Sequence, residues 1–213
     1  MKSILVVGMG EFGKHVAKQL SLRDIEVCIV DQDKDVINLL SDDFENAYIG
    51  DCMQKITLKQ LGVANFDICI VCIGDNFQAS LEITSNLKEL GAKYIISKAH
   101  SDTQSKFLKM AGANETIYPE KEMAEKVAVK CSANNIFDYI RFSSGYSVFE
   151  LTVPKTWIGE NLKDLNVRSV YGINVIAINR NGSIVMPTAA FVFEKDDHVF
   201  IFGKESIIDA LQK

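Results

Sequence analysis

The sequence predicts an α/β fold in which a doubly wound parallel sheet is followed by a small α+β domain. Two observations predict it. Up to residue 118, runs rich in valine and isoleucine alternate with amphipathic helical segments, and the runs are apolar on both faces, as in a covered parallel sheet. After residue 137 the spacing changes to short strands joined by tight turns, which is typical of a small mixed module.

The first part is expected to alternate strictly between strands and helices, the order of a Rossmann-type nucleotide-binding sheet. We expect strands at Ile4–Gly8, Glu26–Asp31, Asn46–Gly50, Asp67–Ile73, Lys93–Lys98 and Glu115–Tyr118. We expect helices near residues 11–22, 34–42, 53–61, 76–90 and 102–111. Two of these helices are followed by Gly91 and Gly112, which suit the left-handed conformation found after a helix end.

A long helix is expected to begin at Pro119, because proline suits the first helical position, and to run to about Asn135. Asn181-Gly182 is the dipeptide of a two-residue hairpin turn. Beyond the helix we expect strands at Ser147–Val153, Asn174–Asn179, Ser183–Met186 and His198–Gly203, and short helices near 161–165 and 205–212. The predicted domains are residues 1–118, a crossover helix at 119–137 and a small domain at 138–213.

The composition excludes several classes of partner. Of the 213 residues 24% are charged, and the formal net charge is −5. Nucleic-acid binding needs a basic face, which no cluster of lysine and arginine supplies. No apolar stretch reaches the length of a membrane span, so we expect a cytosolic protein. Cys69 and Cys72 have the spacing of a metal-binding pair, but on a strand they would point to opposite faces and belong to the core.

The strongest functional signal is the glycine-rich segment Gly8-Met9-Gly10-Glu11-Phe12-Gly13. It follows an apolar strand and opens a helix, which is the context in which this pattern holds a pyrophosphate. The first glycine makes the tight turn, the second lets the backbone approach the phosphates, and the third permits close packing of helix and strand. The helix N-terminus offers unpaired N–H groups to the same phosphates.

Acidic and basic residues follow other strands of the predicted sheet. Asp31 ends the second strand, where a carboxylate accepts hydrogen bonds from ribose hydroxyls and disfavours a 2′-phosphate, so NADP is not expected. Asp51 is equally well explained as a helix cap, and Lys98 as a solvated strand end. For Glu120, compensation of a helix dipole is the favoured interpretation.

Catalysis has no support in the sequence. Tyr94 and Lys98 imitate the Tyr-x-x-x-Lys pair of short-chain dehydrogenases, but that pair needs a helix. On the strand expected here the two side chains would stand about 13 Å apart. The alternative to a nucleotide sensor is an NAD-dependent oxidoreductase whose active site is completed by oligomerisation.

Several segments together resemble a known family over essentially the whole chain. They are the glycine loop, Val30-Asp31-Gln32-Asp33, the run from Val71 to Ser80, Gly112-Ala113, the run from Tyr118 to Met123, the run from Leu165 to Arg168, and Tyr171-Gly172. They resemble the RCK (regulator of K⁺ conductance) family, the cytosolic subunits of Ktr and Trk potassium uptake systems, most closely its KtrA/KtrC branch. The resemblance implies a cytoplasmic, non-enzymatic protein at the inner face of the membrane. Its dimers would assemble into an octameric ring beneath a KtrB/TrkH-like potassium channel subunit, which nucleotide would gate.

The resemblance also implies individual roles. It makes Asp31 the ribose-binding acid, places Asp33 and Asp51 in the adenosine pocket, and makes Lys98 a phosphate-side lysine. Glu120 would hold a divalent cation, Mg²⁺ or Ca²⁺, near the phosphates of ATP or ADP; NAD or NADH is the other candidate ligand. The expected nucleotide-binding residues are Gly8, Met9, Gly10, Glu11, Phe12, Gly13, Asp31, Asp33, Asp51, Cys52, Ile73, Gly74, Lys98 and Glu120.

Three further expectations follow from the resemblance. Glu11 stands where KtrA-like chains often carry arginine, so ATP binding should depend on a divalent cation more than ADP binding does. The small domain is expected either to bind cyclic di-AMP or to form an ordinary dimer interface, through Arg168, Asn174, Val175 and Ile176. One apolar stripe of the long helix is expected to pack across a subunit interface; it comprises Met123, Ala124, Val127, Ala128 and Cys131.

Overall fold

A computed structural model describes residues 1–132, 136–142, 145–207 and 211. The chain forms two compact units, Met1–Lys121 and Glu122–Lys213, which are described separately. The predicted division into three parts, with residues 119–137 as a helix of its own, stays a prediction. No helix in the described ranges combines the length and the apolar character needed to cross a membrane.

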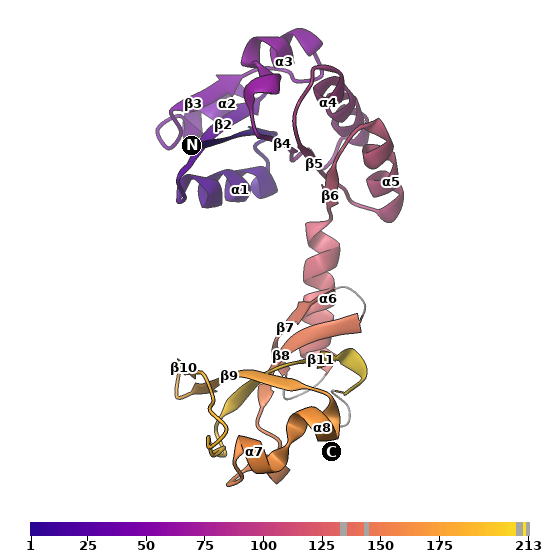
Figure 1. Ribbon diagram of the computed structural model, residues 1–213. Helices are drawn as coiled ribbons and strands as arrows, with labels where there is room; N and C mark the ends of the chain where they lie inside the picture. The colour runs from indigo at the N-terminus through magenta and orange to yellow at the C-terminus, as the bar shows by residue number, and fades with distance from the viewer. Residues whose placement is uncertain (133–135, 143–144, 208–210, 212–213) are drawn as a thin grey trace. The chain divides into compact units, whose positions relative to one another are not determined.

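The first unit is built on a six-stranded parallel sheet with strand order β3-β2-β1-β4-β5-β6 (Figure 1). The strands are β1 (Lys2–Val7), β2 (Ile25–Asp31), β3 (Asn46–Ile49), β4 (Ile68–Val71), β5 (Ile95–Lys98) and β6 (Glu115–Ile117). The doubly wound parallel sheet is therefore confirmed. From β1 to β3 the strands are added on one side of β1, and from β4 to β6 they are added on its other side. Ligands of such sheets bind outside the carboxyl ends of the strands at this switch point.

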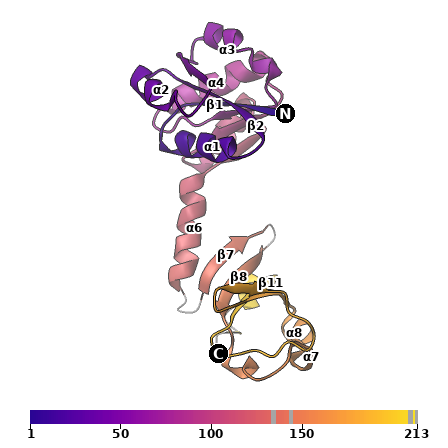
Figure 2. The ribbon, with the colours of Figure 1, turned by 90° about the vertical axis from the view of Figure 1, so that its left-hand side faces the viewer.

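Helices cover both faces of this sheet (Figure 2). They are α1 (Glu11–Ser21), α2 (Lys34–Leu40), α3 (Lys55–Leu61), α4 (Phe77–Glu89) and α5 (Asp102–Ala111). Residues of α1 and α2 share one core with Ile4 and Val6, whereas α3, α4 and α5 share the other with Leu5 and Val7. Neighbouring residues of β1 enter opposite cores because side chains alternate along a strand. This is why the run Ile4–Val7 of β1 is apolar throughout.

The second unit contains a five-stranded antiparallel sheet with strand order β10-β9-β11-β8-β7. Its strands are β7 (Ile136–Arg141), β8 (Tyr146–Thr152), β9 (Asn174–Arg180), β10 (Ser183–Val185) and β11 (His198–Lys204). The core of this unit centres on the fully buried side chains of Trp157, Phe193 and Leu151. Asn181 and Gly182 join β9 to β10 with positive φ angles of 53° and 82°, as the predicted hairpin turn requires.

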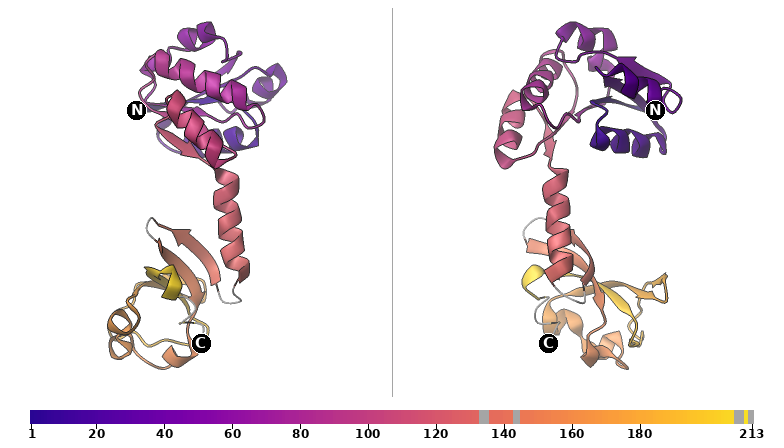
Figure 3. Two further views of the ribbon diagram at one scale, coloured as in Figure 1. Left: turned by 90° about the vertical axis from the view of Figure 1, so that its right-hand side faces the viewer. Right: turned by 180° about the vertical axis from the view of Figure 1, so that it is seen from behind.

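The helix α6 (Pro119–Ser132) is one continuous helix (Figure 3), and α7 (Leu162–Leu165) and α8 (Val167–Tyr171) follow later. Two elements of this part were not predicted, the strand β7 and the helix α8. The predicted boundary near residue 137 falls inside β7 and stays a prediction. The helix expected at 205–212 begins as the 3-10 turn Glu205–Ile207, and most of its remaining length lies outside the described residues, as does Asn135.

Candidate functional site

A pocket of about 260 Å³ opens at the carboxyl ends of the central strands of the first unit. The glycine loop after β1 and the segments after β2, β3 and β4 line it, so it lies at the switch point of the sheet. The predicted site residues that line it are Gly8, Gly10, Asp31, Asp51, Cys52, Ile73 and Gly74. The pocket is therefore placed where a Rossmann-type sheet holds a nucleotide.

Each glycine of the loop has a distinct structural reason. Gly8 has a φ of +92°, a conformation that other residues rarely adopt, and its N–H donates to the Val30 carbonyl at 2.9 Å. A Cβ on Gly13 would lie 2.0 Å from the Gly8 carbonyl oxygen, so α1 packs against the loop more closely than alanine permits. A Cβ on Gly10 would meet nothing within 4 Å, which leaves the backbone open on the pocket side.

Asp31 ties the glycine loop to the end of β2. Its Oδ2 accepts the Met9 N–H at 2.5 Å, and its Oδ1 accepts the Asp33 N–H at 2.9 Å. Met9 contributes this backbone donor while its side chain is buried in the core. A carboxylate offers about four lone-pair sites, so Asp31 keeps acceptor capacity for ribose hydroxyls while it holds the loop.

We expect Asp31→Ala to weaken nucleotide binding about ten- to hundredfold, because it removes the ribose acceptor and loosens the loop together. Isothermal titration calorimetry with ADP and with NAD measures this. Asp33→Ala is the matched control, since it removes a carboxylate that does not line the pocket. An unchanged affinity in Asp31→Ala would remove Asp31 from the site.

The other residues predicted near the adenosine have separate tasks. Asp33 does not line the pocket; its Oδ1 caps α2 by accepting the N–H groups of Asp35 and Val36 at 2.9 and 3.3 Å. Asp51 does line the pocket, and it also accepts the Met53 N–H at 2.9 Å. Burial raises the pKa of the Cys52 thiol to about 12, so Cys52 lines the pocket as an uncharged side chain.

Phe12, Lys98 and Glu120 come together beside the pocket. The Lys98 Nζ lies 2.7 Å from Glu120 Oε1 and 5.5 Å from the centre of the Phe12 ring. The hydrogen bond from Lys98 lowers the pKa of Glu120 below its usual value. Glu11 is not part of this group: its side chain is 85% exposed and pairs with Lys14 at 3.3 Å, as an exposed residue of a first helical turn does.

Glu120, the residue expected to hold a divalent cation, is the partner of Lys98 in this structure. Over the described parts of the chain, no group of three or more histidine, cysteine, aspartate or glutamate side chains is placed to hold a metal ion. The cation was expected between Glu120 and the phosphates of a nucleotide, and it stays a prediction.

Three polar residues of the pocket were not among the predicted site residues: Gln32, Asp75 and Asn76. Gln32 follows Asp31, and the other two follow Gly74 after β4. Asn76 also caps α4, because its Oδ1 accepts the Ala79 N–H at 3.0 Å. Their positions directly after parallel strands are the sequence signal that could have found them, since such strands end at one edge of the sheet.

In the second unit, Arg168, Asn174 and Val175 surround a shallow hollow of about 410 Å³ between α8 and the start of β9. Ile176, the fourth residue predicted there, does not line the hollow and is 41% exposed. The structure thus brings three of the four residues together.

Residues 4–119 match the TrkA-N domain, and residues 148–213 match the TrkA-C domain. The chain belongs to the TrkA, or RCK, family. Ktr system potassium uptake protein C of Bacillus subtilis (strain 168) is 37% identical over 213 residues, which cover 100% of this chain and 96% of the relative. Ktr system potassium uptake protein A of the same organism is 35% identical over 208 residues, covering 97% and 94%.

Solved structures share the fold of this RCK chain at low sequence identity. The GsuK channel matches it with a TM-score of 0.73 and 19% identity, over 99% of this chain. The GsuK channel bound to NAD matches with a TM-score of 0.70 and 18% identity. This chain spans 39% of either GsuK chain, so the likeness establishes a shared fold for that part.

Proposed function

We propose that this RCK protein is a cytosolic, non-enzymatic regulatory subunit of a potassium uptake system, controlled by an adenine nucleotide in its first unit. The observation that carries the proposal is the similarity to Ktr proteins C and A along nearly their full length. The pocket at the switch point of the sheet supports it, since the glycine loop and Asp31 are already joined there.

The proposed ligand is ATP or ADP, with NAD or NADH as the other candidate. Asp31 and Asp51 face the pocket as carboxylates, which favour ribose hydroxyls and repel a 2′-phosphate. The open backbone at Gly10 leaves room for a pyrophosphate at the N-terminus of α1. A divalent cation, Mg²⁺ or Ca²⁺, is proposed to lie between Glu120 and the phosphates, where it would replace Lys98 as the partner of the Glu120 carboxylate.

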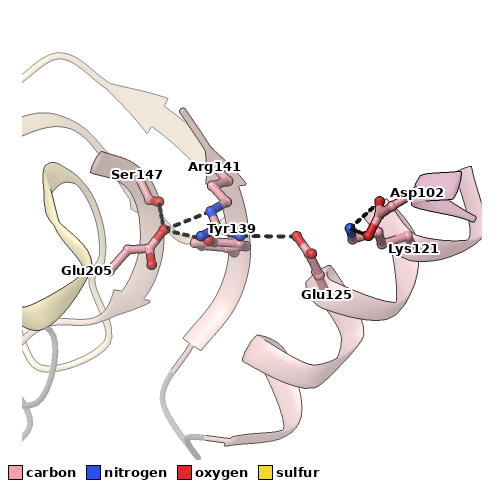
Figure 4. A network of polar contacts seen from close by, with 7 residues as sticks. All are labelled: Asp102, Lys121, Glu125, Tyr139, Arg141, Ser147 and Glu205. Atoms are coloured by element: carbon pink, nitrogen blue, oxygen red, sulfur yellow. Dashed lines mark hydrogen bonds and ion pairs between the residues drawn. The ribbon is translucent and has the colours of Figure 1, made fainter. Parts of the chain in front are cut away.

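The proposed partners are a second copy of this chain, dimers building an octameric ring, and a KtrB/TrkH-like membrane subunit. One face of α6 supports the self-association. Met123 is 60% exposed and Val127 is 52% exposed. Glu125 and Lys126, which lie between these two residues in the sequence, each form an ion pair with a residue of β7; Figure 4 shows the pair of Glu125 with Arg141. The apolar stripe predicted from the sequence is therefore uncovered in the single chain, as an interface between copies requires.

We expect the double variant Met123→Asp and Val127→Asp to dissociate into monomers at micromolar concentration, because a charge inside an apolar interface is costly. Multi-angle light scattering measures the mass. Leu39→Asp, which changes another exposed apolar side chain on α2, is the control and should keep the wild-type mass. A variant that stays oligomeric, or a wild type that is monomeric, would exclude this stripe from the interface.

The hollow beside Arg168 is proposed to take cyclic di-AMP at a dimer interface. A guanidinium next to Asn174 suits a phosphodiester and an adenine edge. Titration of cyclic di-AMP into wild type and Arg168→Ala tests it: loss of binding in the variant supports the proposal. If the wild type does not bind, these residues form an ordinary dimer interface.

The regulatory role is tested by potassium flux. Proteoliposomes carrying the membrane subunit and this chain are loaded with ATP, ADP or NADH, and potassium uptake is followed. We expect flux that depends on the nucleotide and on this chain, without turnover of the nucleotide. Steady oxidation of NADH with no effect on flux would instead favour the alternative, an oxidoreductase.

A further inference from the structure

Asn86 is a polar residue on the side of α4 that serves the nucleotide pocket. Asn76, which caps α4, lines the pocket together with Ala79 and Ile83, at intervals of three and four residues. Asn86 follows Ile83 by three residues, so it continues the same row farther along the helix. The core packing of this turn is supplied by the fully buried Leu87 and does not require an amide at position 86.

The Asn86 amide reaches the segment that follows β3. Its Nδ2 donates to the Met53 carbonyl at 3.3 Å. Residues 50–53 of this segment line the pocket. The strand β2 separates β3 from β1 and its glycine loop, so the segment faces the nucleoside part of a bound nucleotide, away from the helix N-terminus offered to the phosphates.

Met53 connects Asn86 to the carboxylate of Asp51. The Met53 N–H donates to Asp51 Oδ1 at 2.9 Å, while the Met53 carbonyl accepts from Asn86. Both polar groups of the Met53 backbone are therefore held, one by each neighbour. Asp51 Oδ2 accepts from the Gln54 amide at 3.5 Å, a long hydrogen bond that leaves acceptor capacity for the N–H and O–H donors of an adenosine.

A second contact joins the same two parts of the chain. Glu89, three residues after Asn86, pairs with Lys55, the first residue of α3. The helices α3 and α4 pack against each other in the first unit (Figure 1). Both side chains of the ion pair are exposed, and exposed ion pairs contribute little to stability. The partly buried Asn86 is therefore the contact that fixes the segment after β3.

We propose that Asn86 is a positioning residue for the nucleotide site: its amide fixes the Met53 peptide, and through it the direction of the Asp51 carboxylate. The inference rests on the proposed function and adds to it a residue that does not line the pocket. Without the amide, the Met53 peptide is free to turn, and the carboxylate loses a fixed donor. Binding then includes the cost of ordering this segment, so the affinity for the nucleotide falls.

The experiment separates the hydrogen bond from the packing of the side chain. Asn86→Asp keeps the size of the residue but replaces the donor with an acceptor, which repels the Met53 carbonyl. Asn86→Leu removes the polar group. Ser85→Asp is the matched control, because it adds the same charge at the neighbouring position of the same helix. ADP is titrated by calorimetry into each full chain, and thermal unfolding without ligand shows that each variant is folded.

We expect both Asn86 variants to lower the ADP affinity about fivefold, the effect of one hydrogen bond, and Ser85→Asp to bind like the wild type. In an Asp51→Ala background, Asn86→Leu should lower the affinity no further, because the carboxylate that Asn86 positions is gone. A purely structural role predicts an equal loss in both backgrounds.

The inference is overturned if both Asn86 variants bind ADP like the wild type, or if Ser85→Asp weakens binding as much as they do. It is also overturned if Asn86→Leu lowers the affinity by the same factor with and without Asp51, which would make Asn86 a packing residue. A wild-type chain that does not bind ADP contradicts the proposed function itself. A wild type that binds ADP and loses it in Asp31→Ala confines any failure to the role of Asn86.

Discussion

Gly13→Ala is expected to lower the free energy of unfolding by about 3 kcal/mol or more. The new Cβ would lie 2.0 Å from the Gly8 carbonyl oxygen and 3.2 Å from the Cys72 Cβ. The loop cannot withdraw without cost, because the Gly8 N–H is bonded to Val30 and the Met9 N–H to Asp31. α1 must therefore move away from the sheet and uncover part of its core. Urea unfolding of the full chain measures the change.

Gly10→Ala is the matched control for this prediction. Gly10 has a φ of −67°, which alanine adopts freely, and its Cβ would meet nothing within 4 Å. We expect wild-type stability together with loss of nucleotide binding, because the added methyl occupies the space of the phosphates. Equal stability of Gly13→Ala and Gly10→Ala would contradict the packing role assigned to Gly13.

Asp197→Ala is expected to destabilise the second unit by about 1.5–3 kcal/mol, because it removes a buried carboxylate that accepts charge-assisted hydrogen bonds from Arg180. Asp197 is 1% exposed. Arg180 donates two hydrogen bonds of 2.7 Å to it, from Nε to Oδ1 and from Nη2 to Oδ2. Oδ2 also accepts the Glu194 N–H at 2.8 Å. This pair fastens the end of β9 to the segment before β11. The neighbouring exposed Asp196→Ala is the control and should change stability little.

The same pair gives the second unit a dependence on pH. Burial alone would raise the pKa of Asp197, but the hydrogen bonds from Arg180 and the Glu194 N–H lower it below the ordinary value of 3.8. A depressed pKa in the folded state means that the stabilisation is complete above the unfolded pKa and is lost as the pH falls through the folded one. The gap in stability between wild type and Asp197→Ala should therefore shrink when the pH is lowered from 7 to below about 3.8. A gap that is constant with pH would show that the carboxylate charge is not the cause.

The sheet of the first unit could be predicted because its signal is local and repeated. The central strands β1, β2 and β4 are largely apolar on both faces, and two helices are followed by glycines that can be seen in the sequence. Gly91 and Gly112 have the positive φ angles, 82° and 122°, that this interpretation requires. The strand β7 was missed because its pairing with β8 shifts register between Ile136 and Asp138, which breaks the alternation of buried and exposed residues.

Within the site, residues that come directly after a strand could be placed from the sequence. Residues whose position depends on an ion pair with a distant residue could not. Asp31 and Asp51 lie at the pocket because they follow β2 and β3. The pairing of Lys98 with Glu120 depends on how α6 leaves the sheet after β6, which no local pattern encodes. For the same reason, a single sequence could not show whether Asp33 faces the ligand or caps α2.

The central claim is that the first unit binds an adenine nucleotide through the glycine loop and Asp31. Calorimetric titration of the full chain with ADP, NAD and NADP tests it most directly. We predict that ADP or NAD binds with one site per chain, and that NADP binds at least about tenfold more weakly than NAD, because its 2′-phosphate would meet the Asp31 carboxylate. Failure of all three to bind, or equal affinity for NAD and NADP, would contradict the account.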